Sequence, residues 1–249
     1  MNHLLVDDES GIRTITFDRP DAKNALTLAM RRQLCELLDA SDQDASIKAV
    51  ILTGTDPVFT AGVDFKEFDP SFDPRQRRYS TNPGRALRAM RTPAVCAING
   101  ACVSGGLEIA LSASFMVASE RARFADTHAR LNVVPAWGLT ALLPKAVGVR
   151  KAREMSLTGN FVDADEALQI GLVNHVVAHD ELLAFTRGLA AEIADAPAAA
   201  DILSLYLHGE DLGLNAALAL ETERVADIPF DQAEFGAAGR ATASRQRAT

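Results

Sequence analysis

Two short turns built from small residues constrain the fold of this chain more than any other feature. One lies within residues 59–68 and contains Gly62, and the other lies within residues 99–108 and contains Gly105 and Gly106. Each turn follows an apolar run of the kind that forms β-strands, and each leads towards a predicted helix. Turns of this kind leave backbone N–H groups unpaired and directed into space. Two such N–H groups that converge would stabilise the negative charge of an enolate or a tetrahedral intermediate, so the sequence predicts an oxyanion hole.

Apolar runs of strand type alternate with helical patterns along the chain, which indicates an α/β fold. Residues 3–6 and 12–17 flank a predicted hairpin turn at residues 7–11, and Asp163 is a predicted helix N-cap with Glu166 three residues on. Buried strands are predicted at residues 49–54, 94–100 and 115–119, a last short strand at residues 173–177, and helices at residues 27–42, 181–194, 198–207 and 214–225.

The stretch from Asp69 to Gly84 contains Pro70, Pro74 and Pro83, so it is not one long helix. It is predicted to be either a mobile loop near the site, with room for a short helix, or an ordinary solvated surface loop. The tail after Gly236 is rich in Ala and Arg and has little to bury, so disorder is expected there.

Composition narrows the class of protein. The chain has 249 residues, is 48% hydrophobic and carries a net charge of −8, which suits a compact domain and disfavours a general nucleic-acid binder. No apolar run approaches the roughly 20 residues that span a bilayer, and the acidic N-terminus is unlike a secretory signal, so no membrane association is expected. Cys35, Cys96 and Cys102 lack a CxxC pair and lie in apolar surroundings. They are predicted to be buried, inert thiols in a reducing compartment, which favours the cytoplasm.

Motifs for metals and phosphates are missing. The histidines outside the candidate site show no HExxH spacing, and the sequence contains no Gly-x-Ser-x-Gly elbow, no GxGxxG fingerprint and no Walker loop. No metal site is therefore predicted.

Glu108 is the strongest candidate for a catalytic side chain. Residues 103–113 are apolar apart from Ser104, Glu108 and Ser112. A carboxylate in such surroundings is costly unless it is paired or protonated, and groups of this kind are frequent acid–base catalysts. The alternative is a core glutamate that is hydrogen-bonded to a helix end.

The two turn segments, with the chain from Arg19-Pro20 to about Val177, resemble the crotonase superfamily, the enoyl-CoA hydratase/isomerase family. The resemblance implies a spiral of ββα units with a C-terminal helical region. We accordingly predict a core domain over residues 1–180 and a helical oligomerisation region with a tail over residues 181–249. The resemblance also implies a homotrimer or a dimer of trimers.

The same resemblance assigns roles to residues of the two turns. The oxyanion N–H groups match Val63 and Gly105, and coenzyme A would lie along the first turn, mostly against backbone groups. Lys23 and Lys66 would offer charge nearby, or they are solvated surface lysines. The matching CoA-binding positions are Lys23, Ala61, Val63, Asp64, Phe65 and Lys66.

The resemblance fails at one position. Hydratases of the family carry a second glutamate four residues after a strand-borne Phe, whereas here Phe124 is followed at that spacing by His128. Histidine exchanges protons near neutral pH, so His128 is either the partner of Glu108 or a hydrogen-bonded structural residue. Asp126 is a nearby carboxylate that could act instead of His128. It lies on the same face of the strand as His128 only if the strand continues to His128. Trp137 stands where small residues are usual and is predicted to fill and reshape the acyl pocket.

These features predict an enzyme that processes acyl-CoA thioesters through an enolate, first of all a 2-enoyl-CoA hydratase or isomerase of fatty acid metabolism. Another superfamily reaction, such as decarboxylation, C–C hydrolysis or thioester cleavage, is one alternative. A non-catalytic acyl-CoA-binding protein is another, which the buried charge of Glu108 disfavours. Coenzyme A would be part of the substrate, and no separate cofactor is expected.

Overall fold

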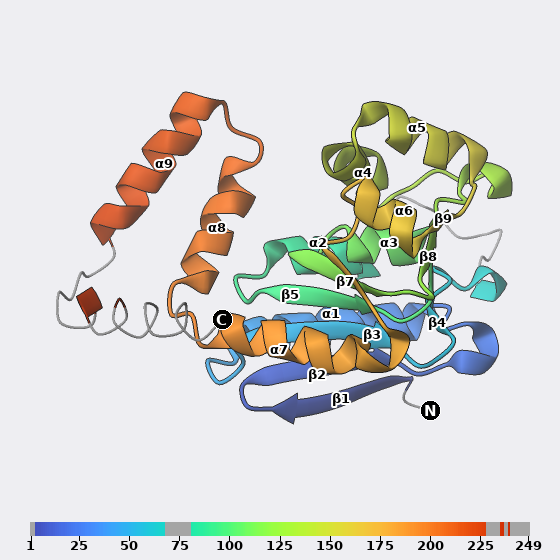
Figure 1. Ribbon diagram of the computed structural model, residues 1–249, viewed down its shortest axis with the longest axis horizontal. Helices are drawn as coiled ribbons and strands as arrows, with labels where there is room; N and C mark the ends of the chain where they lie inside the picture. Colours follow the sequence, from blue (N-terminus) through green and yellow to red (C-terminus); the bar gives the residue numbers. More distant parts are fainter. Residues whose placement is uncertain (1–2, 68–80, 228–234, 237–238, 240–249) are drawn as a thin grey trace. The chain divides into compact units, whose positions relative to one another are not determined.

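The computed structural model describes residues 3–67, 81–227, 235–236 and 239, and its contacts divide the chain into one unit that ends at Leu203 and another that starts at Ser204. The first unit contains two β-sheets and most of the helices (Figure 1). No helix in the described part of the chain has the length and apolar character that crossing a membrane requires.

The larger sheet has six strands, and it begins with the predicted hairpin. Ser10 and Gly11 adopt φ values of 52° and 78°, which close a two-residue turn and extend the first strand beyond its predicted end. The hairpin is antiparallel and every later pair in this sheet is parallel. In spatial order the strands are β1 (Leu4–Glu9), β2 (Ile12–Phe17), β3 (Ala49–Gly54), β5 (Ala94–Ile98), β7 (Phe115–Ser119) and β10 (His175–Val177).

The smaller sheet explains how the chain builds its site. Its strands are β4 (Val58–Thr60), β6 (Ala101–Val103), β8 (Arg123–Ala125) and β9 (Val162–Asp163), and the first three run parallel. The chain passes from a strand of the larger sheet to one of the smaller sheet three times, in the pairs β3–β4, β5–β6 and β7–β8. The helices that follow these pairs are α2 (Pro83–Ala89), α3 (Gly105–Ala110) and α4 (Leu139–Val147). This repetition confirms the predicted spiral of ββα units, and the parallel pairing brings the carboxyl ends of β4, β6 and β8 side by side.

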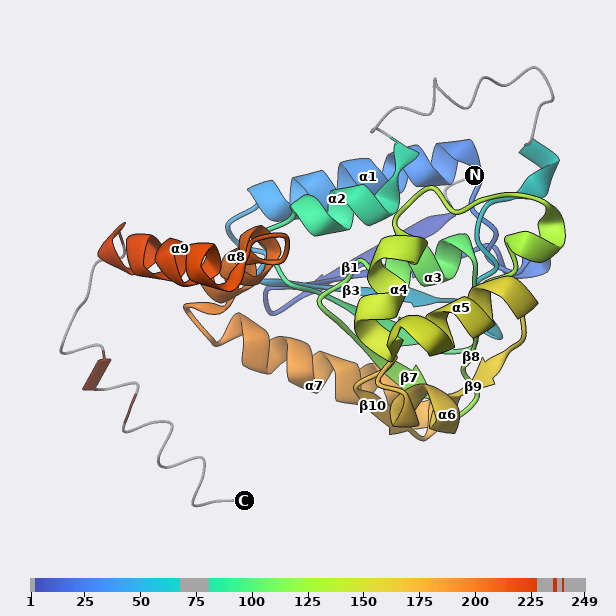
Figure 2. The ribbon, with the colours of Figure 1, turned by 90° about the horizontal axis from the view of Figure 1, so that it is seen from above.

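Helices cover both faces of the larger sheet. Helix α1 (Leu28–Gln43) begins where predicted, because the Thr27 side chain accepts the Met30 N–H at 3.1 Å. Helices α1 and α2 lie on one side of the sheet and α7 (Leu182–Ala194) lies on the other (Figure 2). Buried apolar residues of the strands pack under α7 around Leu182 and Ala190. Two further helices, α5 (Val149–Thr158) and α6 (Ala164–Gln169), complete this unit, and Asp163 caps α6 as predicted.

Two predictions need correction. The loop predicted to reach Gly84 stops earlier, because Asn82 caps α2 and Pro83 takes its first turn, where proline is favoured; residues 69–80 lie outside the described part of the chain. Cys96 and Cys102 are buried, but Cys35 is only partly buried, since it lies beside the inward stripe of α1 that Leu34 and Leu38 form. Almost all of the tail after Gly236 is also outside the described residues.

The C-terminal helices are α8 (Ala199–Gly209) and α9 (Leu214–Asp227), close to their predicted ranges. Helix α7, which the predicted boundary at residue 180 places in the C-terminal region, packs on strands β3 and β5. The role of the C-terminal region in oligomerisation stays a prediction.

Candidate active site

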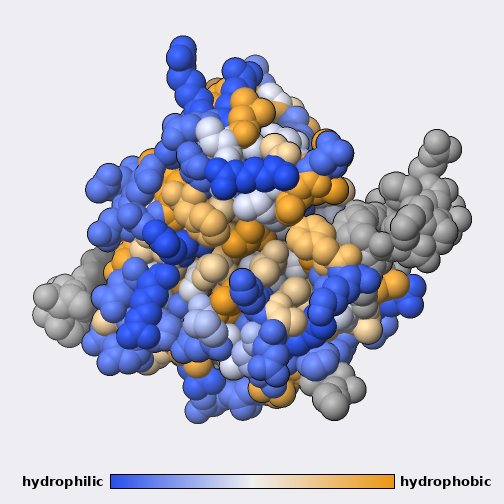
Figure 3. Space-filling model, turned by 90° about the vertical axis from the view of Figure 1, so that its right-hand side faces the viewer, coloured by the Kyte–Doolittle hydropathy of each residue, from blue (hydrophilic) through white to orange (hydrophobic). Residues whose placement is uncertain are grey.

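The three chain segments that leave β4, β6 and β8 line one cavity of about 480 Å³. The first segment contributes Val63, the second Gly105 and Glu108, and the third His128. Trp137, which follows the third segment in the chain, also lines the cavity and is almost wholly buried. Figure 3 shows the side of the molecule that lies on the right in Figure 1, and on this side apolar side chains lie among hydrophilic ones. The structure thus brings Val63, Gly105, Glu108, His128 and Trp137 to the wall of one cavity.

The two small-residue turns touch. A Cβ atom on Gly62 would lie 2.9 Å from the Gly105 nitrogen, and one on Gly105 would lie 3.5 Å from the Val63 nitrogen. Within the described residues, the N–H groups of Val63 and Gly105 donate to no acceptor, whereas the Asp64 N–H donates to the Leu26 carbonyl at 3.0 Å. Two adjacent, unpaired N–H groups at a cavity wall have the arrangement that stabilises a developing oxyanion.

Glu108 lies on α3 at the wall of the cavity with only 2% of its surface exposed. Its Oε1 atom accepts the N–H of Trp137 at 2.6 Å and, more weakly, that of Leu139 at 3.4 Å. Burial raises the pKa of Glu108, and the Trp137 hydrogen bond and the neighbouring His128 offset this rise only in part. A carboxyl group with a raised pKa exchanges protons closer to neutral pH than an exposed one does.

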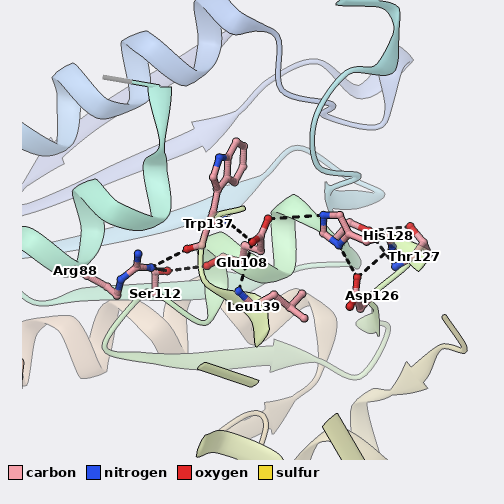
Figure 4. Close-up of polar contacts among 9 residues, drawn as sticks. Arg88, Glu108, Ser112, Asp126, Thr127, His128, Trp137 and Leu139 are labelled. Atoms are coloured by element: carbon pink, nitrogen blue, oxygen red, sulfur yellow. Dashed lines mark hydrogen bonds and ion pairs between the residues drawn. The ribbon is translucent and has the colours of Figure 1, made fainter. Parts of the chain in front are cut away.

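His128 lies between two carboxyl groups (Figure 4). Its Nε2 atom is 3.8 Å from Oε2 of Glu108, and its Nδ1 atom is 2.5 Å from Oδ1 of Asp126. The strand does not continue to His128, because β8 ends at Ala125 and His128 has helical backbone angles at the start of the 3-10 turn η5 (Ala129–Leu131). Asp126 therefore meets His128 through a tight turn, which strand alternation did not predict.

Comparison with known proteins identifies the family. The family model described as enoyl-CoA hydratase/isomerase matches residues 7–233. The chain belongs to the enoyl-CoA hydratase/isomerase family. It is 39% identical over 226 residues to a probable peroxisomal enoyl-CoA hydratase of Arabidopsis thaliana, a match that covers 90% of this chain and 85% of the relative. The resemblance stated from the two turns is thereby confirmed, and with it an enzyme of the enoyl-CoA hydratase type.

Comparison with solved structures also finds enoyl-CoA hydratases. The enoyl-CoA hydratase of Mycobacterium tuberculosis H37Rv matches with a TM-score of 0.77 and 44% identity, over 88% of this chain and 96% of that chain. The enoyl-CoA hydratase of Bacillus anthracis matches with a TM-score of 0.89 and 28% identity, over 97% of both chains. The crotonase-type fold therefore extends over nearly the whole sequence.

The predicted CoA-binding positions of this family member divide into two groups. Ala61, Val63 and Phe65 line the cavity, whereas Lys23 and Lys66 do not. The side chain of Asp64 is engaged elsewhere: it pairs with Arg19 at 2.6 Å, and it accepts the Lys66 N–H at 3.0 Å. The hydrogen bond from Arg19 outweighs partial burial and lowers the pKa of Asp64. Asp64 thus ties the first turn to the chain before α1, and any role in binding CoA would fall to its backbone.

Sequence reasoning missed the cation in the cavity wall. Arg31 of α1 lines the cavity, and its guanidinium lies 5.9 Å from the centre of the Trp137 ring. The signal was present, because Arg31 precedes Leu34 and Leu38 by three and seven residues and so lies on the inward stripe of α1. The remaining unpredicted cavity residues are Thr81, Asn82, Ser104, Leu131, Asn132, Val133, Val134 and Ala136.

A second cluster of Ser, His and Asp lies outside the cavity. His179 contacts Ser119 Oγ through Nδ1 and Asp56 through Nε2, both at 2.9 Å. Ser119 is completely buried, and its oxygen also accepts the Arg121 N–H. A hydroxyl that no substrate reaches is not a nucleophile, so this cluster fastens the chain after β10 to β7 and to the turn after β3.

Proposed function

We propose that this protein adds water to the double bond of a 2-enoyl-CoA, with the related double-bond shift as a side activity. The observation that carries the proposal is the meeting, in one cavity, of two unpaired N–H groups and an acid–base pair. The N–H groups of Val63 and Gly105 would hold the thioester oxygen as it becomes an enolate. Glu108 and His128 would exchange the protons.

The proton count of the pair suits addition of water. Hydration needs one group that takes a proton from water and one that delivers a proton to the α-carbon. The pair Glu108 and His128 with one shared proton contains one acid and one base, whichever of the two holds that proton. The raised pKa of Glu108 supports such sharing. A binding protein without chemistry gains nothing from a carboxyl group buried in this way.

The proposal is tested at His128, where this chain departs from the resembled hydratases. His128→Ala should reduce turnover of a short 2-enoyl-CoA by about 100-fold or more, while binding of the CoA ester, measured by calorimetry, survives. His128→Glu should retain or raise hydration. His208→Ala, which removes an exposed histidine of α8, is the control and should leave turnover unchanged.

The same variants should be assayed with malonyl-type and β-diketone thioesters. If the parent leaves enoyl-CoA unchanged and turns over one of these other esters in a His128-dependent way, a different crotonase reaction replaces the hydratase proposal. If no ester binds at millimolar concentration, the acyl-CoA site itself is refuted.

Assembly and location are further parts of the proposal. Helices α8 and α9 expose the apolar side chains of Tyr206, Leu214 and Val225. Surfaces of this kind mark contacts between proteins, so we expect a homotrimer or a dimer of trimers. The free cysteines fit a reducing compartment, so we place the enzyme in the cytoplasm, acting in fatty acid metabolism. A monomeric mass by light scattering at micromolar concentration would refute the assembly.

A further inference from the structure

The Asp126 side chain, which contacts the ring of His128, has no role in the reaction described so far. Asp126 is 1% exposed, and its Oδ1 atom faces two nitrogens of the same residue, the backbone N–H of His128 at 3.2 Å and the ring Nδ1 at 2.5 Å. Burial acts to raise the pKa of Asp126, but hydrogen bonds from His128 and Ser156 outweigh it, and the pKa is lowered. Asp126 is therefore a buried carboxylate that stays ionised.

An ionised carboxylate fixes which ring nitrogen carries the proton. A carboxylate only accepts hydrogen bonds, so the Nδ1 atom that faces Asp126 must be the N–H donor. The other nitrogen, Nε2, is then the atom that gains and loses a proton. That atom faces Glu108 across 3.8 Å at the wall of the cavity.

Hydrogen bonds also join the turn that carries Asp126 and His128 to the turn that contains Gly105. The Ser104 N–H donates to the Ala125 carbonyl at 2.9 Å, and the Thr127 N–H donates to Ser104 Oγ at 3.0 Å. Ser104 has a φ of 47°, a conformation uncommon for a residue with a side chain, and it immediately precedes Gly105. The position of His128 relative to the oxyanion N–H groups is thus set by bonds between the two turns.

We propose that Asp126 is a positioning residue that orients the His128 ring and keeps Nε2 as the proton-exchanging atom towards Glu108. This proposal rests on the proposed function, since it names what makes a histidine serve where the resembled hydratases use a glutamate. A lone histidine would be free to turn its ring and to carry its proton on either nitrogen. The carboxyl groups that contact the ring in the described residues are Asp126 and Glu108, and Arg31 is a further charged residue that lines the same cavity.

Asp126→Asn tests the proposal, because the amide keeps the size of the side chain and can donate to Nδ1. That donation would place the remaining ring proton on Nε2, the wrong atom. We expect kcat for a short 2-enoyl-CoA to fall by about 100-fold or more, while KM and the affinity for the CoA ester change less than about threefold. The pH dependence of kcat/KM should also change, because the variant lacks the negative charge of Asp126 beside the ring.

Asp56→Asn is the matched control. It alters the other His–Asp contact found among the described residues, which is 2.9 Å long and lies outside the cavity. It should leave kcat and the pH profile unchanged. Asp126→Asn with kcat within threefold of the parent and an unmoved pH profile would overturn the proposal.

A measurement on the parent protein keeps the test independent of how the variant folds. Nitrogen-15 NMR of histidine-labelled protein should show His128 with its proton on Nδ1 when the ring is neutral, the resonance being assigned by its loss in His128→Ala. A proton on Nε2 instead would refute the proposal. If the parent shows the Nδ1 proton but hydrates no enoyl-CoA, the proposed reaction fails while the orientation of His128 by Asp126 stands.

Discussion

Replacing Gly62 by alanine should separate the two turns that carry the proposed oxyanion N–H groups. The residue has a φ of +86°, and an added Cβ would lie 2.9 Å from the Gly105 nitrogen and 3.0 Å from the Val103 carbonyl oxygen. The first distance is about 0.5 Å shorter than the 3.4 Å at which ordinary van der Waals contact begins. Both neighbours are backbone atoms, so the turn that carries Gly105 must move or the Gly62 turn must open.

Two magnitudes follow. The left-handed backbone conformation alone should cost about 1–2 kcal/mol of unfolding free energy when a side chain is added. Because a displacement near 1 Å of a catalytic group costs up to about 100-fold, a shift of roughly half that size should reduce kcat by about 10-fold. Binding of the CoA ester should change much less, since the proposed oxyanion N–H groups would act chiefly in the transition state.

Gly171→Ala is the control for backbone strain. Gly171 has a φ of +77°, but an added Cβ would meet its nearest atom at 3.4 Å, and the residue does not line the cavity. Urea denaturation should show a loss of about 1–2 kcal/mol, with kcat unchanged. Steady-state assays of a short 2-enoyl-CoA then compare the two variants. A folded Gly62→Ala protein with the same kcat as Gly171→Ala would refute the conclusion that the two turns act together.

Three further predictions concern single side chains. Glu108→Gln should reduce kcat by about 100-fold or more in the enoyl-CoA assay while ester binding persists, since the amide oxygen still accepts the Trp137 N–H. The pKa of Glu108 is raised, so the folded parent keeps the carboxyl proton of Glu108 at pH values where the unfolded chain has lost it, and the unfolding free energy of the parent falls as the pH rises above the usual glutamate range. Denaturation at several pH values should therefore show the Gln variant gaining stability relative to the parent over that interval. A difference in stability that stays constant with pH would contradict this expectation. Trp137→Ala should raise the kcat/KM of long-chain relative to short-chain enoyl-CoA esters by about tenfold, because the variant removes only the indole from the cavity wall. An unchanged chain-length preference would show that the indole does not limit the length of the acyl group. His179→Ala should lower the unfolding free energy by about 1–3 kcal/mol in urea denaturation with kcat unchanged, because buried Ser119 loses a partner, and a fall in kcat would place His179 in the reaction.

The sequence by itself determined the local elements and the chemistry that each turn offers. Thr27 marked the start of α1, the continuous apolar run before Gly100 marked a buried strand, and Asp163 marked the start of α6. Each of these signals acts between residues a few positions apart, through a cap, a period or a run. Glu108 was likewise visible, because a carboxylate stands out among apolar neighbours whatever the fold around it.

Only the tertiary structure decided how these parts meet. Strands β4, β6 and β8 have three residues each, too few to show a period, yet their parallel pairing places the turns after Thr60, Val103 and Ala125 at one edge. The contact of Asp126 with His128 depends on the strand ending at Ala125, which hydrogen bonds to Ser104 help to set. Such contacts depend on strand pairing between segments distant in the chain, and no local pattern encodes that pairing.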